Sequence, residues 1–198
     1  MEASLLDVVR EAVPAAALEV LPSIDMPTVS VDRDHAIAVF RVLRDHPSLQ
    51  FTFLADVTAV DRLPAAPRFE LVYHLACLGP AGGSSAPARR LRVKVGVEGE
   101  DPRAWSVVAL YPTAGWPERE VFDLFGIAFE GHPDLRRILM PDDWEGAPLR
   151  KDYPVQIRKT TESWSPIQLT VEEFAENIRA RRAQATARAQ SPPRGPRD

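Results

Sequence analysis

The spacing of apolar residues along the first half of the chain changes between two periods. Apolar residues recur at helical spacing from Ser4 to Val13 and again from Asp32 to His46, which predicts two amphipathic helices. Other stretches alternate apolar and polar residues, as half-buried strands do. We therefore expect five strands, at residues 18–21, 28–31, 51–60, 69–78 and 91–97.

A third helix and an irregular loop follow these strands. Glu118 and Glu120 favour the positive end of a helix, and Gly126 can adopt the left-handed conformation that ends it. Four prolines then interrupt residues 132–154, and each pushes the residue before it toward an extended conformation. We expect this loop to be rigid.

The order of these elements predicts the fold class. Runs of adjacent strands joined by short turns favour an α+β fold of two layers, with helices on one face of a mixed or antiparallel sheet. We expect one such domain over residues 1–154. An extended arm with a short helix over residues 155–182 is expected to dock on a partner, and residues 183–198 are expected to form a disordered basic tail.

Composition limits the chemistry that the chain can perform. Its 198 residues are 45% hydrophobic and 26% charged, which suits one sizeable core. Nothing in the chain resembles a spanning helix or a secretion signal, so we expect neither secretion nor a membrane span. The single cysteine, Cys77, cannot form an internal disulfide or hold an iron–sulfur cluster or zinc site alone, and we expect it to be a buried, inert thiol. The chain has no glycine-rich motif of the kind that binds NAD or ATP.

Charge is unevenly distributed along the chain. The net charge is −4, yet six arginines follow Ile178, so the body is acidic and the tail is basic. An acidic body would repel phosphate, which argues against a nucleic-acid partner. A protein surface or lipid headgroups fit this pattern better.

Five residues around the third helix could carry chemistry as metal ligands or as an acid–base pair. They are Glu118, Glu120, Asp123, His132 and Asp134. His132 also stands in a Gly-His-Pro turn, where an imidazole commonly bonds a backbone carbonyl.

The same region also contains cations that suit a structural network. Arg119, Arg136 and Arg137 could pair with Glu120 and Asp123 in a partly buried layer. Such pairs would hold the loop against the helix without any catalysis. We favour this structural interpretation.

All four tryptophans lie in the second half of the chain. We expect Trp105 and Trp116 to fill the core. Trp144, which is surrounded by carboxylates, and Trp164 are candidates for a partner interface, because tryptophan is enriched at binding hot spots.

The spacing of residues 118–138 resembles the signature of the 30-kilodalton subunit of respiratory complex I, which is the C-type subunit of bacterial NADH:quinone oxidoreductase. A second segment, residues 148–154, is similar to the same family, and a looser likeness extends over about residues 5–160. The matching positions are Glu118, Arg119, Glu120, Asp123, Leu124, Phe125, His132, Arg136, Ile138, Pro148, Leu149, Arg150, Lys151, Asp152, Tyr153 and Pro154.

This resemblance implies a scaffold and assembly role in the hydrophilic arm of a proton-translocating NADH:quinone oxidoreductase. The partners would be the 49-kilodalton-type subunit and its neighbours in the arm, peripheral to the cytoplasmic side of the inner membrane. The chain would contact the membrane only through the complex. FMN, iron–sulfur clusters and quinone would belong to partner subunits, so the signature residues would be structural or docking residues, with no catalytic, cofactor or metal role.

Two alternatives remain open. Membrane-bound hydrogenases and ferredoxin:quinone oxidoreductases contain similar subunits, so the chain could be the equivalent component of such a complex. A stand-alone metal-dependent hydrolase would use Glu120, Asp123 and His132.

Overall fold

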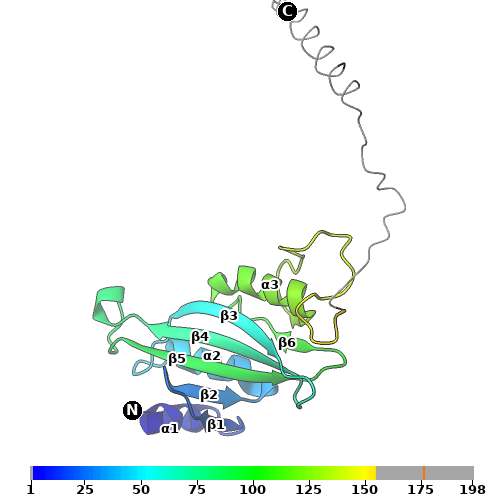
Figure 1. Ribbon diagram of the computed structural model, residues 1–198. Coiled ribbons are helices and arrows are strands. Elements are labelled where there is room, and N and C mark those ends of the chain that lie inside the picture. Colours follow the sequence, from blue (N-terminus) through cyan, green and yellow to red (C-terminus); the bar gives the residue numbers. More distant parts are fainter. Residues whose placement is uncertain (1, 155–175, 177–198) are drawn as a thin grey trace, which may run out of the picture. The chain divides into compact units, whose positions relative to one another are not determined.

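A five-stranded mixed sheet forms the centre of the domain in the computed structural model, which describes residues 2–154 and residue 176 (Figure 1). The strand order is β1-β2-β5-β4-β3; β2 runs parallel to β5 and the other neighbours are antiparallel. This confirms the predicted α+β class with a mixed sheet. The strands are β1 (Leu18–Leu21), β2 (Thr28–Val31), β3 (Phe53–Asp61), β4 (Phe69–Cys77) and β5 (Arg89–Val97).

One face of the sheet carries the apolar positions that the alternation predicts. Tyr73 of β4 lies directly opposite Val93 of β5, and both are buried. Helices α1 (Glu2–Ala12) and α2 (Ala36–Asp45) add their apolar sides to this core, and Figure 1 shows α2 behind the strands. Polar side chains on these strands also form ion pairs: Lys94 of β5 with Glu70 of β4, and Arg92 of β5 with Asp25 in the loop before β2.

Local signals explain where α2 begins. Asp32 accepts a hydrogen bond from the backbone nitrogen of His35 at 3.1 Å, and the 3-10 turn Arg33–His35 leads into the helix. This is the behaviour of an N-cap aspartate. Asp32 therefore caps the 3-10 turn, whereas α2 itself has His35 at its N-cap position, with no side-chain cap bond, and starts slightly later in the chain than the pattern indicated.

The third helix, α3 (Gly115–Phe125), packs against β3 and ends at Gly126, whose φ of 72° lies in the left-handed region. Two strands of three residues each, β6 (Arg103–Trp105) and β7 (Ala128–Glu130), pair in parallel beside it. Sequence periodicity did not predict β6 and β7, because three residues are too few to show alternation.

Cys77 is buried in the core, as expected, with its sulfur 3.2 Å from Ser84 Oγ. The described elements belong to one compact unit, Met1–Pro154. The predicted arm over residues 155–182, including Trp164, and the predicted tail over residues 183–198 lie outside the described residues, apart from residue 176.

Candidate functional site

The buried carboxylate of Asp123, near the end of α3, holds the loop that follows the helix. It accepts hydrogen bonds from three consecutive backbone nitrogens, those of Ile138 (3.0 Å), Leu139 (2.7 Å) and Met140 (2.8 Å), and pairs with Arg137 Nη1 at 2.7 Å. Burial alone would raise the pKa of Asp123, but these donors outweigh it and hold the pKa below its usual range. An ionised Asp123 therefore fixes the loop.

Two arginines complete this arrangement by donating to loop carbonyls. Arg137 Nη2 donates to the oxygens of Trp144 (2.9 Å) and Gly146 (3.1 Å). Arg119 donates from Nε to the oxygen of Arg136 and from Nη2 to that of Arg137, both at 3.0 Å. The loop is thus bonded at both its backbone nitrogens and its carbonyls. These bonds are a physical reason to expect the loop to be rigid.

The predicted pairing is correct for Asp123 and Arg137. It is wrong for the three other members, since Arg119 donates to backbone carbonyls and not to a carboxylate. Arg136 has a side chain that is 74% exposed, and it pairs with Asp134 at 2.7 Å. Glu120 is exposed on the outer side of α3. Although Arg136 and Arg137 are adjacent in the chain, only Arg137 reaches the buried carboxylate.

Glu118 is fully buried at the start of α3, which the sequence pattern did not predict. Its carboxylate accepts from the backbone nitrogen of Val107 at 2.8 Å and from Ser106 Oγ at 2.6 Å. Burial raises the pKa of Glu118 to about 7, although both donors oppose the shift. The residue links the first turn of α3 to the chain that follows β6.

His132 bonds the backbone as its turn context predicted. Its Nε2 lies 3.0 Å from the oxygen of Gly115, and its Nδ1 lies 3.0 Å from the nitrogen of Asp134. Because the backbone nitrogen must donate to Nδ1, the ring proton sits on Nε2 and is donated to Gly115. The imidazole therefore ties the loop to the start of α3.

The residues of the hydrolase hypothesis are not brought together. Asp123 is occupied by the loop nitrogens, His132 by Gly115, and Glu120 points to solvent. In the part of the chain that the structure describes, no group of three or more His, Cys, Asp or Glu side chains could hold a metal ion.

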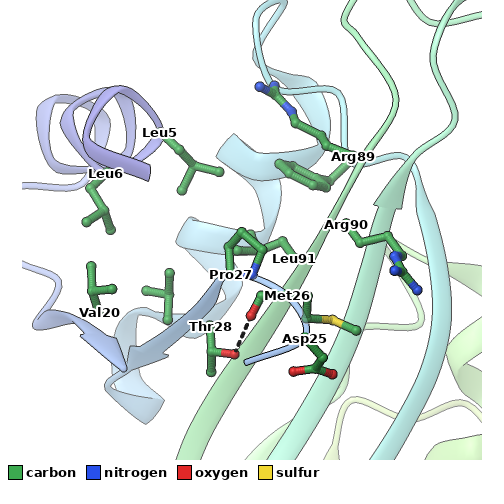
Figure 2. Close-up of a pocket in the computed structure, with 12 residues that line it drawn as sticks. Leu5, Leu6, Val20, Asp25, Met26, Pro27, Thr28, Arg89, Arg90 and Leu91 are labelled. Atoms are coloured by element: carbon green, nitrogen blue, oxygen red, sulfur yellow. Dashed lines mark hydrogen bonds between the residues drawn. The ribbon is translucent and has the colours of Figure 1, made fainter. Parts of the chain in front are cut away.

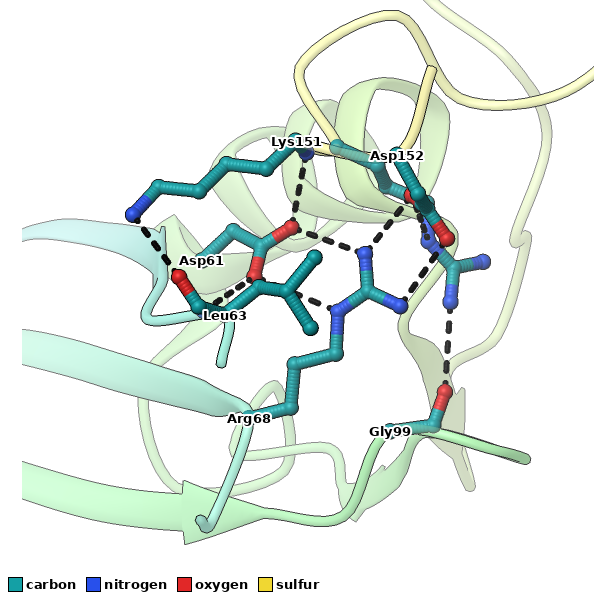
Figure 3. A network of polar contacts seen from close by, with 7 residues as sticks. Asp61, Leu63, Arg68, Gly99, Lys151 and Asp152 are labelled. Carbon is teal, nitrogen blue, oxygen red and sulfur yellow. Dashed lines mark hydrogen bonds and ion pairs between the residues drawn. The ribbon is translucent and has the colours of Figure 1, made fainter. Parts of the chain in front are cut away.

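A second polar cluster fastens residues 148–154 to the sheet (Figure 3). Arg68 bonds both carboxylate oxygens of Asp61, at 2.9 and 3.2 Å, and reaches Asp152 at 2.6 Å. The backbone nitrogen of Lys151 donates to Asp61 at 2.8 Å. The guanidinium of Arg68 holds the pKa of Asp61 well below its usual range.

The ring of Phe69 lies between two guanidinium groups in this cluster. The guanidinium carbons of Arg68 and Arg150 are 4.9 and 5.2 Å from its centroid, distances typical of cation–π contacts. Arg150 also donates to the oxygen of Gly99, and Leu149 bonds backbone to backbone with α3 at Leu124. The contacts of Arg150 and Leu149 hold residues 148–154 against the domain.

The tryptophans are placed differently from the prediction. Trp105 and Trp116 are 49% and 70% exposed, so neither fills the core. Trp144 is partly buried, and its ring stacks on that of Tyr153 with centroids 6.4 Å apart. Sequence alone could not show that Trp116 is exposed, because the side of α3 that faces the core is set by tertiary packing.

A cavity of about 220 Å³ lies away from this loop, where α1, β2 and β5 meet (Figure 2). Leu5, Leu6 and Val20 project into it, and its lining is mainly apolar. Asp25, the acidic residue in the lining, is paired with Arg92 at 2.6 Å. The cavity therefore presents no free acid–base pair.

Residues 29–159 match the model of the family described as respiratory-chain NADH dehydrogenase, 30 Kd subunit. The chain belongs to this family. It is 50% identical over 129 residues to the C-type subunit of the NADH-quinone oxidoreductase of Saccharopolyspora erythraea, a match that covers 65% of this chain and 49% of that protein. It thus spans about half the length of that family member. The corresponding protein of Roseiflexus sp. (strain RS-1) is 45% identical over 153 residues, which is 77% of this chain and 84% of the Roseiflexus protein.

Two solved structures share this fold. A trypsin-resistant fragment of Nqo5 superposes with a TM-score of 0.52 at 33% identity, covering 68% of this chain and 98% of the fragment. A chain from the membrane-bound sulfane sulfur reductase, an archaeal respiratory membrane complex, reaches a TM-score of 0.64 at 24% identity over 86% of this chain and 96% of that chain. At that identity the likeness concerns the fold.

Among the described residues, no helix has the length and apolarity needed to cross a membrane.

Proposed function

We propose that this chain is a non-catalytic scaffold subunit in the hydrophilic arm of an NADH:quinone oxidoreductase, docking through the surface formed by residues 118–154. The proposal is supported by the family and by the names of the family members, each a C-type subunit of NADH-quinone oxidoreductase. In the assembled enzyme, electrons would pass from NADH to quinone through FMN and iron–sulfur clusters in other subunits.

One observation carries the proposal more than the others. Most of the charged side chains at the family positions form hydrogen bonds to other groups of this domain. Asp123, Arg119 and His132, for example, bond backbone atoms of the loop and of α3. Groups committed in this way cannot also serve as a nucleophile or general base without breaking the fold. They shape a surface, and a rigid surface suits binding, because little entropy is lost when it docks.

The partner that we propose is the 49-kilodalton-type subunit, on the cytoplasmic side of the inner membrane. Residues 155–182 would extend along that partner. The alternative, an equivalent role in another respiratory membrane complex, is supported at the level of fold by the likeness to the sulfane sulfur reductase chain.

The test is to recover the tagged chain from host membranes in mild detergent and identify its companions by mass spectrometry. We expect the 49-kilodalton-type subunit together with NADH-oxidising activity in the same fraction. Untagged membranes control for adventitious binding. Recovery with hydrogenase or sulfur-reducing subunits would support the alternative, and recovery of the chain alone would contradict both.

A further inference from the structure

Trp116 presents an indole on the first turn of α3 with 70% of its surface exposed. The guanidinium carbon of Arg119, one turn further along, lies 5.7 Å from the ring centroid. Large exposed aromatic side chains beside an arginine are characteristic of interface hot spots, where a few such residues dominate binding. This pair is therefore a candidate for an anchor point.

The backbone under this pair is immobilised by the family residues. His132 bonds the oxygen of Gly115, the residue directly before Trp116. Arg119 is held by the oxygens of Arg136 and Arg137. An aromatic side chain on a fixed turn loses little conformational entropy on binding. His132 and Arg119 thus act as positioning residues for Trp116.

The charge of Arg119 indicates what would bind beside the ring. Within the described residues, no carboxylate lies in ion-pairing distance of Arg119, whose bonds go to neutral carbonyls. The neighbouring Asp134 is paired with Arg136, which is the main reason that the pKa of Asp134 is lowered; the charge of Arg119 adds a smaller effect without forming an ion pair. A carboxylate from another chain would be attracted to Arg119 and would satisfy its charge.

We propose that Trp116 and Arg119 form an anchor for an acidic segment of a companion protein in the complex, which places an aliphatic or proline side chain on the indole and a carboxylate beside the guanidinium. This inference rests on the proposed function and names the chemistry of the partner at one point of the docking surface. The complementarity is electrostatic at Arg119 and apolar at Trp116.

The test replaces Trp116 with the photocrosslinking amino acid p-benzoylphenylalanine in the full chain, expressed as the only copy in the host. The complex is purified, irradiated and digested, and the crosslinked peptides are sequenced. We expect a peptide from a companion protein with Asp or Glu within a few residues of the crosslink. The same label at Trp105, which is 49% exposed on β6, is the matched control and should not capture that peptide.

The outcomes separate this inference from the proposed function. If the chain is recovered with its companions but the label at 116 captures no companion, or captures a segment without acidic residues, the anchor is wrong while the scaffold function stands. If no companions are recovered with the wild-type chain, both are overturned.

A second measurement does not depend on the crosslink. Trp116→Ala should leave the melting temperature of the isolated chain unchanged, because the side chain is largely exposed, and should weaken retention in the complex at least about tenfold. Trp105→Ala should change retention less than about twofold. Equal retention of the two variants would overturn the anchor.

Discussion

Asp61 on β3 accepts a 2.8 Å hydrogen bond from the backbone nitrogen of Lys151, a residue ninety positions later in the chain. The same carboxylate is bonded twice by Arg68, which also reaches Asp152. One buried carboxylate therefore connects the sheet to the end of the loop that follows α3.

Replacing this carboxylate should release the loop end. Asp61→Asn removes the charge that Arg68 binds and should lower the free energy of unfolding by about 2 kcal/mol, a typical loss for hydrogen bonds to charged groups. Urea denaturation measures the change. Asp25→Asn is the matched control, since Asp25 also pairs with an arginine but is exposed. The urea midpoint of this variant should equal that of the wild type. Equal effects of the two substitutions would contradict a structural role specific to Asp61.

The adjacent arginines 136 and 137 should respond very differently to the same substitution. Arg137→Ala leaves the buried Asp123 without its cation and should destabilise the domain by about 3 kcal/mol. Arg136→Ala removes an exposed pair with Asp134 and should leave the unfolding midpoint unchanged. Thermal and urea unfolding of both variants measure the two changes in stability. A larger loss from Arg136→Ala than from Arg137→Ala would show that the described pairing is incorrect.

Glu118 should make stability depend on pH near neutrality. Its pKa rises from an ordinary value of 4.5 to about 7 on folding, so the folded state binds a proton more tightly than the unfolded state. The contribution of Glu118 to stability is then greatest below pH 4.5, falls as the pH rises toward 7, and is level above that. The shift corresponds to about 3 kcal/mol.

Glu118→Gln isolates this contribution, because the amide keeps the shape and can still bond Val107 and Ser106. At about pH 8 the variant should be more stable than wild type, and the difference should vanish near pH 4.5. His74, whose pKa is lowered mainly by burial, contributes to stability with the opposite sign and is common to both proteins. A constant difference across this pH range would mean that Glu118 does not titrate there.

Truncation after residue 160 tests the predicted arm. We expect the melting temperature of the domain to stay nearly unchanged, while incorporation into the complex weakens, because an arm that orders on a partner contributes binding energy only there. Limited proteolysis of the free chain provides a second readout. Resistance of residues 155–182 equal to that of the domain would show that the arm packs on its own chain.

Periodicity predicted the main elements because each is long enough to display its period. The alternation at Phe69–Cys77 and the stop at Gly126 both have local causes, and both are found. Strands β6 and β7 were missed because each is only three residues long and pairs with a distant segment.

The candidate site depended more on tertiary packing, so less of it could be predicted. The family positions identified Asp123 and His132, but no local signal marks Asp61, whose partners Arg68 and Lys151 are seven and ninety positions away. The burial of Glu118 follows from the chain after β6 covering it. The hydrophobicity of Trp116 argued for the core, yet the fold leaves its indole in solvent.

We propose that this chain is needed to assemble an NADH:quinone oxidoreductase and performs no chemistry itself. The test is to measure NADH-driven quinone reduction in membranes of a host that lacks the chain, alongside the size of the complex on native gels. We predict that both the activity and the full-size complex are lost, that wild-type chain restores them, and that purified chain alone oxidises no NADH. A full-size, active complex in the deletion strain would contradict the account.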